Sequence, residues 1–367
     1  MYANRYHKLQ ALMQENHCDV LVFNPGPSLL YLTGLSFHLS ERPVVLFISQ
    51  KQHPLMILPK LEKEKLGQSQ IPLEGIFFDD NPETWQSAFN QASAHLNLKN
   101  KRLGYETVRL RALELFLIMN SAPECDLFNA ENIIATMRMK KDDEEIKRMQ
   151  KAVEIAQKGL IATLPIIRPG ITEKEIASEL TAQLLRHGSD PEFPFYPIVS
   201  GGPNSANPHA TPTERPLQPG DLFVIDWGAS YQGYVADLTR TFAIGKVEPE
   251  LQRIAEIVLQ ANNEGKKVAR SGIPIGEVDK ATRRIIETAG YGEFFTHRTG
   301  HGLGLEGHEP PYLFSENRLV IENGMTFTIE PGIYLPGKGG VRIEDDVVIT
   351  HEGCHSLSDL PRELVIL

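Results

Sequence analysis

The sequence is poor in cysteine and has no long apolar run. Only 3 of its 367 residues are cysteines, and Cys18, Cys125 and Cys354 lie too far apart in the chain for a CxxC metal or redox pair or a disulfide framework. No segment approaches the roughly 18 consecutive apolar residues that a membrane-spanning helix needs. The N-terminal residues predict an amphipathic segment rather than a signal peptide. These features favour a cytoplasmic protein that does not act at a membrane.

Positive charge is also scarce. The chain has 37 basic and 47 acidic residues, which gives a formal net charge of −10, and it has no long basic stripe. Nucleic-acid binding is therefore disfavoured. A hydrophobic fraction of 41% excludes general disorder, and the length suffices for two domains with buried cores. Twelve histidines and the surplus of carboxylates make a metal site worth seeking.

We expect an α/β domain over residues 1–137 and a second domain over residues 138–367. The expected elements of the first are strands at 19–23, 43–49, 54–58 and 102–106 and helices at 6–14 and 110–119, with residues 50–53 forming a hairpin loop. A basic run ending at Lys141 and an acidic run beginning at Asp142 mark the boundary. Asp142 and Glu145 have the spacing of a capping box, which predicts a long helix to about Thr163.

The second domain contains an internal repeat with an offset of 102 residues. The offset aligns several residues without a gap, among them Gln150 with Gln252, Glu154 with Glu256, Gly170 with Gly272, Glu175 with Glu277 and Gly188 with Gly290. Each copy is expected to form a long helix, a glycine turn, a second helix and then strands. The second helix should begin at Thr172 in the first copy and at Pro274 in the second.

Acidic residues interrupt apolar strands at matching places in the two copies. In the first copy, a two-residue loop at Tyr231-Gln232 would place Asp226 directly opposite Asp237. In the second, a three-residue loop centred on Gly337 would place Glu330 opposite Glu344. Four carboxylates gathered in an apolar setting are costly unless cations bind them. The residues alone therefore predict a carboxylate-rich dinuclear metal site, with nearby histidines available as ligands.

In order and context, Asp226, Asp237, His301, Glu330 and Glu344 resemble the five metal ligands of the pita-bread metallopeptidases. The preceding domain, with Tyr31-Leu-Thr-Gly34, resembles the creatinase-like N-terminal domain of the proline-specific branch, which holds the Xaa-Pro dipeptidases (prolidases) and aminopeptidases P. The resemblance spans the chain. It implies an α/β creatinase-like domain followed by an α+β pita-bread domain with pseudo-twofold duplication.

The resemblance also implies a role for each residue. Asp237 and Glu344 would bridge two divalent ions, Asp226 would complete one site, and His301 and Glu330 would complete the other. The hard, oxygen-rich ligand set suits Mn or Co, with Zn or Fe as alternatives. Glu330 would also accept and pass on a proton from the attacking water. Four further residues match family positions and are candidate catalytic residues: His209, His297, His308 and Arg342. For Arg342 we favour contact with a ligand carboxylate over contact with substrate.

The expected activity is hydrolysis of the bond between an N-terminal residue and proline in small peptides, by a homodimer. The compact length favours a dipeptidase over an aminopeptidase P. Two other readings remain open: a metal-free, creatinase-like amidinohydrolase, and a non-catalytic pita-bread binding protein. Both are disfavoured because all five ligand positions are intact.

Overall fold

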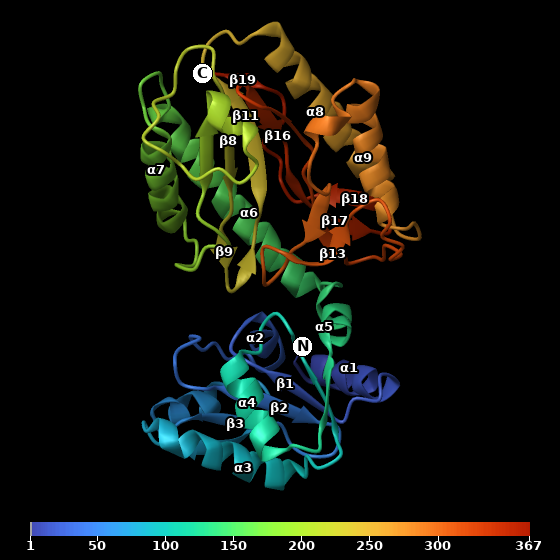
Figure 1. The fold of residues 1–367 in the computed structure, drawn as a ribbon. Coiled ribbons are helices and arrows are strands. Elements are labelled where there is room, and N and C mark those ends of the chain that lie inside the picture. Colours follow the sequence, from blue (N-terminus) through green and yellow to red (C-terminus); the bar gives the residue numbers. More distant parts are fainter. Residues whose placement is uncertain (1) are drawn as a thin grey trace. The chain divides into compact units, whose positions relative to one another are not determined.

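A computed structural model describes residues 2–367 of the chain. The chain divides into two compact units, Met1–Arg138 and Met139–Leu367. Among the residues described, no helix combines the length and the apolar character needed to cross a membrane. Figure 1 shows both units, coloured along the sequence.

The first unit is built on a mixed six-stranded sheet with the strand order β4-β3-β2-β1-β5-β6. Its strands are β1 (Val20–Phe23), β2 (Val45–Ser49), β3 (Leu55–Pro59), β4 (Glu74–Phe78), β5 (Arg102–Tyr105) and β6 (Asp126–Asn129). Its helices are α1 (Tyr2–Glu15), α2 (Pro27–Thr33), α3 (Trp85–Leu96), α4 (Ala112–Ser121) and α5 (Glu131–Arg138). The expected hairpin is confirmed, because β2 and β3 are antiparallel with Val45 opposite Ile57.

Strands β1 to β3 are buried along their whole length, as a sheet covered on both faces requires. Alternate residues, Val20 and Val22 of β1 and Phe47 of β2, pack with apolar side chains of α3 and α4. The residues between them, such as Leu21 and Leu46, are equally buried on the opposite face. The first unit is therefore an α/β layer structure, as the sequence predicts.

The second unit alternates helix pairs and strands. Its helices are α6 (Asp143–Thr163), α7 (Glu173–Arg186), α8 (Pro249–Val268) and α9 (Gly276–Thr288). Its first strands are β7 (Ile198–Gly201), β8 (Leu222–Trp227), β9 (Ser230–Tyr231), β10 (Tyr234–Val235) and β11 (Leu238–Ala243). The later strands are β12 (Gly300–Gly302), β13 (Glu309–Leu313), β14 (Thr326–Ile329), β15 (Gly332–Leu335), β16 (Gly339–Arg342), β17 (Asp345–Thr350), β18 (Gly353–Ser356) and β19 (Val365–Ile366).

The helices follow the predicted repeat. A shift of 102 residues carries α6 onto α8 and α7 onto α9 to within a few residues. In Figure 1 the green helix α7 and the orange helix α9 lie on opposite sides of the strands. Both predicted capping boxes, Asp142 with Glu145 and Thr172 with Glu175, are present. The second helix of copy two begins at Gly276 rather than at Pro274, because Pro274 forms a β-bridge with Val320.

The strands form two main sheets, ordered β19-β11-β8-β7 and β13-β12-β14-β17-β18. One predicted hairpin register is wrong. The loop between β9 and β10 consists of Gln232 and Gly233, so Asp226 lies opposite Thr239 and not Asp237. Both loop residues have positive φ (50° and 81°), which is the backbone of a type I′ hairpin turn and explains the glycine. Because the pairing shifts by an even number of residues, Asp226 and Asp237 stay on the same face as diagonal neighbours.

The other register is confirmed. β15 and β16 pair with Leu335 opposite Gly339, which leaves residues 336–338 as a three-residue loop. β14 and β17 continue in the same register, with Ile329 opposite Asp345. Glu330 and Glu344 therefore occupy opposed positions at the break between the two strand pairs.

The two copies join along β11. The Glu344 amide donates to the Thr239 carbonyl at 3.1 Å, and the Asp237 amide donates to the Asp346 carboxylate at 2.9 Å. Thr241 and Arg342 exchange two further hydrogen bonds, between the Thr241 hydroxyl and the backbone of Arg342. These bonds bring the acidic residues of both hairpins to one place in the interior of the second unit.

Candidate metal centre

Six side chains at this junction form three overlapping groups that could each hold a metal ion. Within each group the ligand atoms lie within 4.8 Å of one another. The groups are Asp226, Asp237 and Glu344; His301, Glu330 and Glu344; and Asp237, His301 and His308. All five ligands expected from the sequence are thus brought together, and His308 is added to them.

The carboxylates Asp226, Asp237 and Glu344 lie close together and are all buried. Burial raises the pKa of Asp237 well above its usual range, and repulsion from Glu344 and Asp226 raises it further. Burial and repulsion from Glu330 and Asp226 do the same for Glu344. These groups are held where their ionised forms repel, which is the electrostatic setting that a divalent cation relieves.

His301 lies on β12 and faces the carboxylates. Its Nδ1 is 3.2 Å from the carbonyl oxygen of Gly302, which can only accept, so Nδ1 carries the proton in the neutral ring. Nε2 then presents its lone pair 3.2 Å from Glu330 Oε1 and 3.7 Å from Asp237 Oδ2. A lone pair facing carboxylate oxygens calls for a cation between them.

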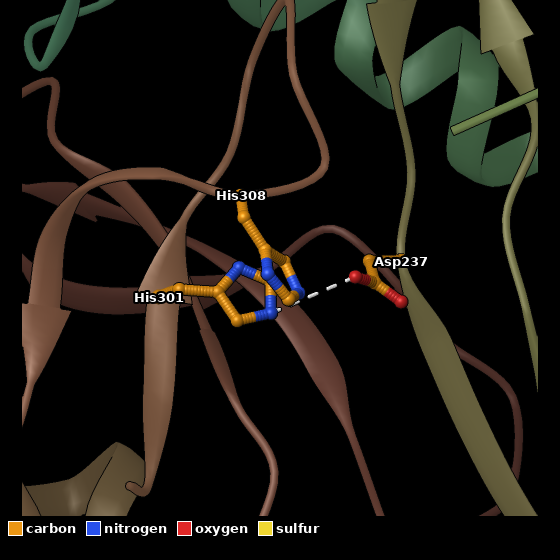
Figure 2. A group of neighbouring side chains, drawn as sticks. All are labelled: Asp237, His301 and His308. Carbon is orange, nitrogen blue, oxygen red and sulfur yellow. Dashed lines mark ion pairs between the residues drawn. The ribbon is translucent and has the colours of Figure 1, made fainter. Parts of the chain in front are cut away.

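His308 lies against His301 at the edge of the centre. Figure 2 shows the two imidazoles beside Asp237, and their ring centroids are 3.9 Å apart. Part of His308 reaches solvent. Desolvation by the surrounding packing lowers its pKa to about 4. A neutral His308 can act as a ligand or as a hydrogen-bond partner of substrate.

Arg342 is buried, and its guanidinium contacts a carboxylate of the centre. Its Nη2 donates to Asp226 Oδ2 at 2.5 Å, and its Nε donates to the hydroxyl of Thr239 at 3.2 Å. Its Nη1 donates to Tyr334 Oη at 3.0 Å, and Tyr334 Oη lies 2.8 Å from His297 Nε2. Because His297 Nδ1 bonds to the Arg298 carbonyl, Nε2 is the acceptor and Tyr334 donates to it. A chain of hydrogen bonds therefore runs from His297 to Asp226.

His209 is the most peripheral of the predicted residues. Its side chain is exposed and belongs to none of the three metal-competent groups, although its charge contributes to lowering the pKa of His297 and of His308. The segment that carries it is firmly held. The buried carboxylate of Glu173 on α7 accepts bonds from the amides of Gly201 and Thr213, at 2.7 and 2.9 Å.

The residues present fit a pair of divalent ions. Asp226 Oδ1 is buried and has no hydrogen-bond partner, although Oδ2 of the same carboxylate is bound by Arg342. A buried carboxylate oxygen with no donor is rare in native structures, and a metal ion would satisfy it. Four carboxylates and an imidazole form a hard donor set.

Sequence reasoning missed three supporting residues: Tyr334, Thr239 and Asp346. The Thr239 hydroxyl donates to Glu344 Oε2 at 2.6 Å, Asp346 holds the Asp237 amide, and Tyr334 joins His297 to Arg342. The only available signal was that Thr239 and Asp346 lie two residues from expected ligands. Nothing local marks Tyr334, because its contacts depend on the packing of β15 against a distant loop.

The chain is similar to known proteins over its whole length. Residues 147–351 match the family described as metallopeptidase family M24, and residues 5–140 match the creatinase/prolidase N-terminal domain. An Xaa-Pro dipeptidase of Lactobacillus delbrueckii subsp. lactis is 32% identical, with 98% of each chain covered. The crystal structure of a dipeptidase from Pyrococcus horikoshii OT3 superposes with a TM-score of 0.93 at 38% identity, covering 99% of this chain and 100% of that one. A prolidase from Thermococcus sibiricus gives a TM-score of 0.93 at 34% identity, covering 100% and 99%.

Proposed function

Because the chain belongs to metallopeptidase family M24 and is a hydrolase with a creatinase-type N-terminal domain and a pita-bread domain, we propose that it cleaves the bond between an N-terminal residue and proline. The observation that carries the proposal is the ligand cluster, in which all five expected residues converge. Relatives named Xaa-Pro dipeptidase and prolidase support the substrate class. An amidinohydrolase without metal or a non-catalytic binding protein would not need such a cluster.

We assign Asp237 and Glu344 as the carboxylates shared between two ions, Asp226 as a ligand of one, and His301 and Glu330 as ligands of the other. Such ions, of which Mn and Co suit the donors best, would polarise the scissile carbonyl and would lower the pKa of a water molecule, so that it is readily deprotonated for attack on the carbonyl carbon. Glu330 accepts the proton of that water and delivers it to the departing proline nitrogen. His308 and His209 donate hydrogen bonds to substrate, while Arg342, Tyr334 and His297 hold Asp226 in place.

We further propose that the substrate is a dipeptide, whose free carboxylate lies one residue beyond the scissile bond. A residue of chain spans only about 3.3–3.6 Å, so the group that reads this carboxylate must lie on the wall beside the ligands. Arg298 has that position. It is half-buried, its guanidinium stacks 4.3 Å from the ring centroid of Tyr312, and Tyr312 lies opposite His301 in the β12–β13 ladder.

The other cations near the centre are already engaged. Arg342 is bound to Asp226, and Lys141 is bound to Glu309. Within residues 2–367 the Arg298 guanidinium has no carboxylate partner, so its charge is available to a substrate.

The test is to offer the purified, metal-loaded protein an Xaa-Pro dipeptide, the same dipeptide with an amidated C-terminus, and an Xaa-Pro-Xaa tripeptide. The proposal predicts cleavage of the dipeptide and much slower cleavage of the other two. Comparable rates on dipeptide and tripeptide would indicate an aminopeptidase P. Failure to cleave any of the three with Mn or Co would overturn the proposed function. Arg298→Gln should remove the preference for the free carboxylate, whereas the exposed Arg284→Gln on α9 should not.

Three broader proposals come with the function. We propose a cytoplasmic location, because the prolidase-like relatives and the scarcity of cysteine suit a reducing compartment. We also propose a homodimer, which sedimentation at micromolar concentration would test. We assign metal binding and catalysis to residues 138–367, with residues 1–137 as the creatinase-like domain.

A further inference from the structure

A buried ion pair lies at the base of the loop that carries His308. Lys141 Nζ is 2.8 Å from Glu309 Oε1, and the two side chains are only 1% and 3% exposed. Lys141 lies just before α6, far in sequence from the ligands. Its backbone amide donates to the Gly324 carbonyl at 2.8 Å, so it is fixed to the segment that enters β14.

Glu309 lies next to the positions of both His308 and His301. It follows His308 directly, and it lies opposite Gly302 at the start of the β12–β13 ladder. Gly302 in turn follows His301. The pair therefore lies at the base of the loop 303–308, which follows His301 and Gly302 and ends in His308; the two imidazoles have ring centroids 3.9 Å apart.

The loop is also fitted closely to the ion pair. A Cβ added to Gly304 would lie 2.7 Å from Lys141 Cε and 2.9 Å from Glu309 Oε1, closer than side-chain atoms normally approach. The Gly304 carbonyl accepts a hydrogen bond from the amide of Val235 at 2.8 Å, so this glycine has little room to move away. Gly307 in the same loop differs, since its added Cβ would meet only Pro194, at 3.5 Å.

Stability alone is a weak reason for such a pair, because desolvation of two buried charges offsets most of their attraction. We propose that the Lys141–Glu309 pair is a positioning device, which holds His308 against His301 in the geometry that the reaction requires. This inference rests on the proposed peptidase function. It assigns Lys141 and Glu309 a positioning role, since neither side chain belongs to the three metal-competent groups.

The first test replaces the pair with methionines, Lys141→Met together with Glu309→Met, which removes both charges and keeps an apolar volume. We expect a folded protein that binds the same amount of Mn as wild type and has a similar KM. Its kcat on an Xaa-Pro dipeptide should fall about 10–100-fold, the range seen when groups that orient a metal ligand are lost. The exposed neighbouring pair is the matched control, and Lys140→Gln with Glu322→Gln should leave kcat unchanged.

A second readout does not depend on activity. Amide hydrogen exchange of residues 303–309 in the metal-free protein should become faster in the double methionine variant, while exchange in α6 and α8 stays as in wild type. If the wild-type protein cleaves no Xaa-Pro substrate, the proposed function fails, and this exchange result still decides whether the pair orders the loop. Unchanged exchange, unchanged kcat or a loss of bound Mn would each overturn the inference.

Gly304→Ala tests the same pair if the double variant does not fold. A single methyl group pressed against Lys141 and Glu309 should lower kcat while Mn content is kept. Gly307→Ala, in the same loop, should behave as wild type. Equal kcat values for the two alanine variants would contradict the proposal.

Discussion

Asp237 belongs to two of the three metal-competent groups, and a hydrogen bond to its backbone amide holds it in position. Its amide is held by Asp346, and its carboxylate belongs to metal-competent groups with Asp226 and Glu344 and with His301 and His308. Asp237→Asn keeps the size of the side chain and removes its charge. We expect activity to fall by more than the roughly 100-fold typical of a group that only supports a ligand, with loss of bound metal. Metal analysis and circular dichroism would check this, and substantial activity with a full metal complement would refute the shared role of Asp237.

The neutral His308 imidazole can serve as a metal ligand or as a hydrogen-bond partner of substrate, and one substitution separates the two roles. We predict that His308→Ala keeps its metal and loses about 10²–10⁴ in rate, the range of a general acid–base or hydrogen-bonding group. Metal analysis alongside steady-state kinetics separates the possibilities. If metal is lost together with the imidazole, His308 is a ligand in the group with Asp237 and His301.

Sequence reasoning could find the charged residues of the centre but not their uncharged supports. An acid inside an apolar strand is conspicuous, whereas Tyr334 reads as an ordinary β-strand residue. Its importance comes from a hydroxyl placed 3.0 Å from Arg342 and 2.8 Å from His297, across separate elements. Such contacts are properties of tertiary packing and leave no local pattern.

At the scale of elements, the two hairpins show that the residues of the turn set the register of the strands on either side of it. The Glu330–Glu344 register could be predicted because the two residues are equidistant from Gly337, so that any odd-numbered loop centred on this glycine places them opposite each other. The Asp226–Asp237 register was predicted one loop residue too early, since Gly233 belongs at the second loop position, where φ is positive. The same-face placement survived the error because side chains alternate with a period of two.

Helix α7 is predicted from its N-terminal capping box, and the contribution of that cap to stability can be tested with a control substitution in the same helix. The Thr172 hydroxyl accepts a hydrogen bond from the Glu175 amide at 3.2 Å, and the Glu175 carboxylate accepts one from the Thr172 amide at 2.8 Å. Thr172→Ala should lower the free energy of unfolding by about 1 kcal/mol. Urea denaturation would measure the change, and Ser178→Ala, at an exposed position within the same helix, should be close to neutral. Equal effects of the two substitutions would show that the cap contributes nothing.

At the scale of the whole molecule, the duplicated fold concentrates acidic groups where they destabilise the metal-free protein. A carboxyl group whose pKa is raised in the folded state stabilises the fold below its unfolded pKa, and this contribution is lost as pH rises through the folded pKa. The raised pKa values of Asp237 and Glu344 therefore predict that the metal-free second unit loses stability from about pH 4 upward.

The same linkage predicts that Asp237→Asn is more stable than wild type without metal but gains less stability than wild type when Mn is added. In EDTA, Asp237→Asn should have a higher Tm than wild type, and the difference should grow between pH 5 and pH 8. With Mn at about 100 times its Kd, wild type should gain about 2.7 kcal/mol, or roughly 5–10 °C in Tm for a domain of this size, and the variant should gain less. Thermal melts at several pH values would measure both. A wild-type Tm that is independent of metal would contradict the electrostatic description of the centre.

Anomalous diffraction from crystals soaked in Mn²⁺ tests the central claim most directly. The account predicts two anomalous peaks in each chain, both in contact with the carboxylates of Asp237 and Glu344, one also touching Asp226 and the other touching His301 and Glu330. A single peak, or peaks away from these five side chains, would contradict it.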